Sequence, residues 1–80
     1  MPYIEQVHRE RIREGGALET PGELNFAFSE QIQNYMTNRP LNYRLINDII
    51  GALEGAKLEF YRRVAADYED KAIERNGDVY

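Results

Sequence analysis

The residues best suited to chemistry lie close together in the second half of the chain. Lys57, Tyr61, Arg62 and Arg63 fall within two helical turns, with Phe60 beside them. Cationic side chains bind phosphate oxygens, and aromatic rings stack on bases. This cluster therefore predicts a binding site for a small anionic ligand of the nucleotide type.

A purely structural explanation of the same cluster stays open. At helical spacing Lys57 can pair with Glu54, while Arg62 and Arg63 can both pair with Glu59. The alkyl stems of these cations would then cover neighbouring apolar surface. On an isolated chain this explanation is the simpler one. In a symmetric oligomer, copies of the cluster could converge on an axis, and ligand binding would become an equally good explanation.

Two glycines in the middle of the same helical pattern, Gly51 and Gly55, need a compensating interaction. Each glycine inside a helix costs about 0.5–1 kcal/mol relative to alanine. A close crossing with another helix, in the same or a neighbouring subunit, is one explanation. The other is a flat ligand lying against the bare backbone, in which case Asn47 on the same face joins the candidate ligand-binding residues.

No residue pattern indicates catalysis, a metal site or a bound cofactor. Di-metal helical bundles use Glu-x-x-His pairs, and His8 is the single histidine of the chain. Glu54 and Glu59 are five residues apart and diverge on a helix, and the adjacent Glu69 and Asp70 point in different directions. We therefore expect a non-enzymatic protein.

Composition narrows the classes of partner. The chain has 80 residues, no cysteine and a formal net charge of −4. An acidic balance argues against binding to duplex nucleic acid, which normally requires a basic surface. No apolar run approaches the roughly 20 residues needed to cross a membrane, and the first residues do not resemble a signal peptide. These features predict a cytoplasmic protein.

The hydrophobic periodicity predicts one all-α domain over residues 1–80. Helices are expected at about 4–14, 21–38 and 43–75, with a tail at 76–80. Thr20 and Asn42 are the expected N-caps, with Glu23 closing a capping box on Thr20. Asn76-Gly77 is a helix-stop signal.

The lengths of these helices predict an assembly. The short connection near Pro40 makes the second and third helices an antiparallel hairpin. An unbroken third helix would be roughly 50 Å long against roughly 27 Å for the second. The overhang must be covered by the first helix or by another subunit, or the helix must break near Ala65–Asp67. We expect a homo-oligomer, with symmetric subunits.

Four blocks of the sequence carry a family resemblance. They are MPYI at the start, TPGELN (Thr20–Asn25), INDIIGALEGAKLEFYRRV (Ile46–Val64) and YEDKAIERNGDVY (Tyr68–Tyr80). Together they resemble a family of small uncharacterised proteins of bacteriophages, prophages and some prokaryotic genomes. The resemblance implies an accessory protein of a virus or mobile element that acts in the host cytoplasm. Members tend to have a proline where this chain has Asp67. Such a proline favours a helix break, and the resemblance does not imply that break for this chain.

Two functions follow as hypotheses. In the first, an oligomer sequesters an anionic ligand such as a nucleotide immune signal, held by Lys57, Arg62 and Arg63 with Tyr61 or Phe60 stacking. In the second, the protein is an interaction module that inhibits or adapts a host protein. That module would use the surplus apolar and tyrosine surface at Phe26, Tyr35 and Tyr61, because tyrosine suits interfaces that stay partly wet.

Overall fold

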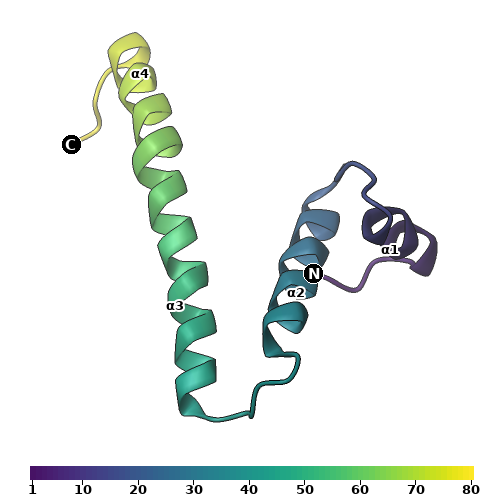
Figure 1. The fold of residues 1–80 in the computed structure, drawn as a ribbon. Coiled ribbons are helices and arrows are strands. Elements are labelled where there is room, and N and C mark those ends of the chain that lie inside the picture. Colours follow the sequence, from purple (N-terminus) through teal and green to yellow (C-terminus); the bar gives the residue numbers. More distant parts are fainter. The chain divides into compact units, whose positions relative to one another are not determined.

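The computed structural model describes residues 1–80 and is all-helical, as predicted (Figure 1). The elements are α1 (Gln6–Arg13), α2 (Pro21–Met36), α3 (Tyr43–Phe60), the π-helical turn η1 (Tyr61–Ala65) and α4 (Ala66–Asn76). The chain divides into two compact units, Met1–Leu41 and Asn42–Tyr80. Each unit is described by itself, and the antiparallel hairpin stays a prediction.

The helix starts are confirmed in atomic detail. The Thr20 hydroxyl accepts a hydrogen bond from the Glu23 backbone N–H at 3.1 Å, and Pro21 occupies the first helical position. The Asn42 side chain accepts from the Leu45 N–H at 2.9 Å. Both caps satisfy backbone donors that a helix start would otherwise leave free.

Glu23 departs from the predicted capping box. Its carboxylate accepts from the Glu19 N–H at 3.0 Å, one residue before the expected Thr20, and from the Arg11 guanidinium at 2.6 Å. The residue is only 4% exposed. Arg11 also donates to the Ala17 carbonyl, so it ties α1, the connector and the start of α2 together. The hydrogen bond from Arg11 holds the pKa of Glu23 below its ordinary value.

Phe26 forms the apolar centre of the first unit. The apolar residues Leu24, Phe28 and Ile32 recur at helical spacing along α2 and leave Phe26 off their stripe, which predicts a second contact surface. The side chain of Phe26 is buried. The guanidinium carbons of Arg9 and Arg13 lie 5.6 and 5.4 Å from the centroid of its ring. Phe26 therefore contacts α1, and it is not free to bind an external partner as the interaction-module hypothesis requires.

Gly22 lets the N-terminal segment approach α2. A Cβ added at this position would lie 3.2 Å from the Met1 carbonyl oxygen and 3.3 Å from a methyl group of Ile4. These distances are shorter than ordinary van der Waals contact, so the missing side chain permits the packing of this unit.

The second unit is one long helix, and the helix does not break near Ala65–Asp67. The backbone keeps helical dihedral angles at Phe60 and at Ala66, on both sides of η1. A π-helical turn adds one residue to a helix and leaves it continuous. The helix ends at Asn76, and Gly77 follows with φ of 89°, which confirms the stop signal.

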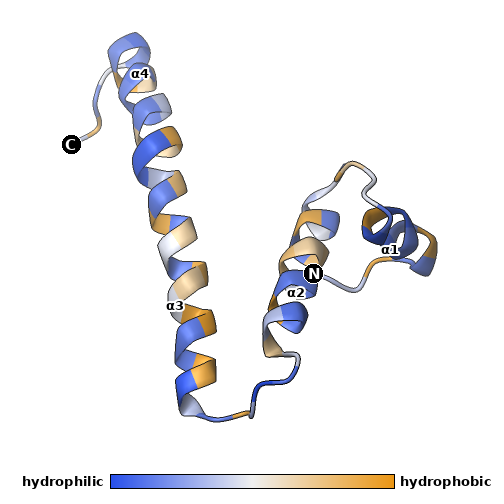
Figure 2. Ribbon diagram, in the orientation of Figure 1, coloured by the Kyte–Doolittle hydropathy of each residue, from blue (hydrophilic) through white to orange (hydrophobic).

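Little of this long helix is buried. Leu45 is its one buried hydrophobic residue. The predicted stripe of Tyr43, Ile46, Ile50, Leu53, Phe60 and Val64 is exposed throughout, with fractions from 39% at Ile46 to 84% at Tyr43. Figure 2 shows hydrophobic residues recurring along α3, whereas α4 is mostly hydrophilic. No helix is both long and apolar enough to span a membrane.

Candidate functional site

The predicted cluster lies where α3 passes into η1. Lys57 and Phe60 belong to the last turn of α3, and Tyr61, Arg62 and Arg63 belong to η1. All five side chains are exposed. The five predicted residues therefore lie within two turns on the surface of the second unit and are here called the band.

The cations of this band form the ion pairs that the structural explanation predicts. Lys57 Nζ lies 3.5 Å from Glu54 Oε1. Arg62 and Arg63 share one oxygen of Glu59, at 2.7 and 2.6 Å. The three cations of the band are thus paired with two carboxylates, Glu54 and Glu59. Exposed pairs of this kind contribute little to stability because solvent screens them, so an anion could displace them.

The band also has a defined electrostatic and aromatic arrangement. The hydrogen bonds from Arg63 and Arg62 lower the pKa of Glu59, which therefore stays ionised at neutral pH. The Tyr61 hydroxyl donates to the Glu69 carboxylate at 3.3 Å, across η1 to α4. The ring of Tyr61 is about half exposed and is available for stacking.

Gly51, Gly55 and Asn47 lie exposed on α3, before the band. A Cβ added at either glycine would meet no atom within 4 Å. Neither glycine therefore has a close neighbour within the second unit. The helix crossing and the bound ligand both stay predictions.

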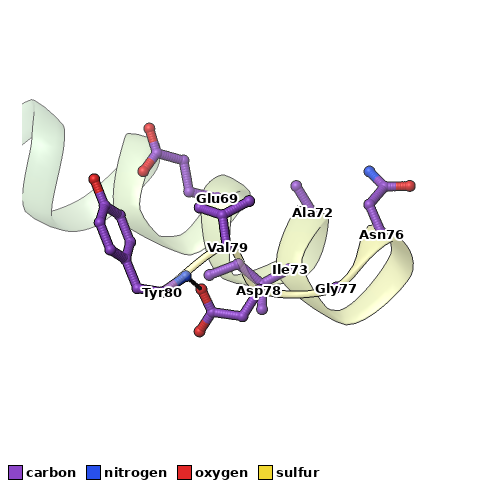
Figure 3. A pocket seen from close by; sticks show the side chains of 8 residues that line it. All are labelled: Glu69, Ala72, Ile73, Asn76, Gly77, Asp78, Val79 and Tyr80. Carbon is purple, nitrogen blue, oxygen red and sulfur yellow. Dashed lines mark hydrogen bonds between the residues drawn. The ribbon is translucent and has the colours of Figure 1, made fainter.

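A groove at the end of α4 has the wrong charge for an anion. Figure 3 shows it between the last turns of α4 and the tail. Its volume is about 380 Å³, and its lining includes the carboxylates of Glu69 and Asp78 but no cation. The tail side chains Val79 and Tyr80 are almost fully exposed. No group of three or more histidine, aspartate or glutamate residues is placed to hold a metal ion.

The first unit holds a groove that the sequence did not reveal. It has a volume of about 540 Å³ and is lined by Pro2, Tyr3, Arg9, Arg13, Phe26, Ser29, Glu30 and Gln33. Two signals could have located it: Arg9 and Arg13 are four residues apart on a helix, and Phe26 lies off the apolar stripe of α2.

The fold defines a small all-helical protein. The comparison with family models is more specific. Residues 1–79 match the model described as "Domain of unknown function (DUF6899)", and the chain belongs to this family. No curated protein and no solved structure matches it.

Proposed function

We propose that this chain is a non-catalytic binding protein that assembles through its long helix and holds an anionic ligand on the band from Lys57 to Arg63. The observation that carries the proposal is the apolar stripe of α3, which the single helix of the second unit cannot cover by itself. An isolated helix gains little stability from its own hydrogen bonds, and most helices in proteins depend on packing of an apolar face. A second copy of the chain is the simplest cover for this stripe.

The size of the stripe fits an interface. The exposed parts of Tyr43, Phe60 and Tyr68 alone represent roughly 400 Å². A standard interface buries about 800 Å² on each partner. The exposed aliphatic side chains of Ile46, Ile50, Leu53 and Val64 add to the aromatic surface. Ile46, Ile50 and Leu53 follow one another at spacings of four and three residues, as in a coiled-coil seam, and Lys57 occupies the next position of that seam.

The ligand part of the proposal rests on what assembly would do to the band. In each copy Arg62 and Arg63 share the single carboxylate of Glu59. If assembly brings these arginines of several copies together at a symmetry axis, an anion between them would reduce their mutual repulsion. The π-helical turn falls within the band, and such turns occur frequently at functional sites.

The resemblance to proteins of bacteriophages suggests the setting. In that setting the assembly would act in the cytoplasm of the host, and a nucleotide immune signal is the ligand that would make sequestration useful. Sequestration requires only affinity and abundance, which suits a chain with no catalytic residues.

The test is native mass spectrometry of the protein as purified from cells, followed by charge reversal. We expect an oligomer with an additional mass that is lost on denaturation and absorbs near 260 nm. Replacing Arg62 and Arg63 with glutamate should remove the additional mass and leave the helicity unchanged. If the additional mass persists in the double variant, the band is not the ligand site.

An interaction module for a host protein is the second candidate. Tyr35 of α2 favours it, because its ring is 42% exposed and carries the guanidinium of Arg39 at 4.0 Å from the ring centroid. In this case Tyr35→Ala should weaken capture of a protein partner, while the Arg62/Arg63 variant should bind as the wild type does. A bare protein that captures no partner, or nucleotide binding without any protein partner, would contradict it.

A further inference from the structure

We propose that the groove of the first unit, between α1 and α2, is a second binding site, specific for an oxyanion such as a phosphate or carboxylate group. This site is separate from the band on the long helix. It depends on neither self-association nor the proposed function.

The two arginines of the groove carry the argument. Arg9 and Arg13 lie one turn apart on α1, and both guanidinium groups lie over the single ring of Phe26. Like charges at this spacing on a helix repel each other. Arg13 is compensated by Glu30, with Nε 2.8 Å from the carboxylate oxygen. Arg9 has no carboxylate within salt-bridge distance.

A hydrogen bond to the backbone restrains the guanidinium group of Arg9. Its Nε donates to the Ile4 carbonyl at 2.8 Å, and the residue is half-buried. This bond and the Phe26 ring fix the plane of the guanidinium, and they leave the terminal nitrogens as donors. A fixed guanidinium fork is the side chain best suited to bind carboxylate or phosphate with two hydrogen bonds.

The opposite wall supplies neutral hydrogen-bonding groups from α2. The half-buried Ser29 and the exposed Gln33 line the groove, and the phenol of Tyr3 lies at its edge. Hydroxyl and amide groups can donate to the remaining oxygens of the anion. Glu30 is the one acidic residue in the lining, and its carboxylate repels an anion. Removing this charge should therefore strengthen anion binding.

The experiment is an NMR titration of the full chain with inorganic phosphate and, separately, with acetate, following the guanidinium signals of Arg9 and Arg13. We expect saturable shifts with at least one anion, and the comparison shows whether phosphate or carboxylate is preferred. Glu30→Gln should tighten binding, because it removes the competing carboxylate from Arg13. Arg9→Gln should weaken binding about tenfold, the effect of losing one charge-assisted hydrogen bond.

Two controls separate binding from folding. Gln33→Ala changes the outer wall without touching Phe26, and it should weaken binding by less than Arg9→Gln while α1 stays folded. Arg44→Gln removes an exposed arginine of α3 and should leave the titration unchanged. Absence of shifts with both anions at tens of millimolar would overturn the proposal. Equal titration shifts in the wild type and in Arg9→Gln would also overturn the proposal. So would weaker anion binding by the Glu30→Gln variant than by the wild type.

Discussion

The two units use the same kinds of residue in opposite ways. In the first unit an aromatic ring and a carboxylate, those of Phe26 and Glu23, are buried. A glycine of the same unit, Gly22, permits the close approach of Met1. In the second unit Phe60 is 63% exposed, Glu59 is an exposed ion-pair partner, and Gly51 has open space around it. The first unit buries these side chains within itself, whereas the single helix of the second unit leaves its own exposed.

A charged residue placed in the exposed stripe of α3 should have the largest effect. Ile50→Glu should weaken self-association by more than about a hundredfold, because a carboxylate at an apolar seam would be buried without a partner. Sedimentation velocity over a range of concentrations would measure the change. The matched control is Arg44→Glu, which adds the same side chain elsewhere on α3. Equal association of wild type and Ile50→Glu would show that the stripe is not the interface.

Removal of the central ring of the first unit should have the next largest effect. Phe26→Ala should cost about 3 kcal/mol of unfolding free energy, because it deletes the apolar contact between α1 and α2. Amide hydrogen exchange resolved by residue would show loss of protection in α1 and at the start of α2. Phe60→Ala is the control and should leave exchange in the first unit unchanged. Uniform loss of protection through both units would contradict their independence.

Glycine substitutions should have opposite signs in the two units. Gly22→Ala should destabilise the first unit by about 1 kcal/mol, because the methyl group meets Met1 and Ile4 at distances below normal contact. Gly51→Ala and Gly55→Ala should each stabilise an isolated long helix by about 0.5–1 kcal/mol.

Thermal unfolding and sedimentation together would show whether Gly51 and Gly55 take part in binding. If another copy or a ligand lies against Gly51 and Gly55, their alanine variants will gain helicity but lose association or bound ligand. A gain in helicity with unchanged association and ligand would leave these glycines without a role in binding.

Acid should affect the first unit through Glu23, and this is the smallest of the expected effects. The pKa of Glu23 is lowered in the folded protein, so its contribution is complete at a pH above the ordinary value of about 4.5. The contribution is lost as the pH falls through the lowered pKa. The unfolding temperature of the Glu23→Gln variant should be lower near neutral pH and less dependent on pH below 4.5. A variant with the same acid profile as the wild type would show that Arg11 and Glu23 do not stabilise the docking of α1.

Sequence reasoning succeeded where the physical cause is local. The caps at Thr20 and Asn42 and the stop at Gly77 depend on residues within one turn, and all three are confirmed. The ion pairs of the band were also predictable, because helical spacing alone brings Glu59 to Arg62 and Arg63.

It failed where two distant segments meet. The burial of Glu23 depends on Arg11, twelve residues away, and nothing in the local pattern around Thr20 indicates that contact. The groove at Arg9 and Arg13 depends on Phe26 in the same way. The π-helical turn has no marker such as proline or glycine between Tyr61 and Ala65, so the pattern left only a choice between a continuous helix and a break.

The central claim is that a second copy covers the exposed stripe of the long helix. Sedimentation velocity of the wild-type protein at micromolar concentrations tests it most directly. The account predicts a concentration-dependent oligomer that Ile50→Glu converts to a monomer with the first unit still folded. A wild-type chain that sediments as a monomer at every concentration would contradict the account.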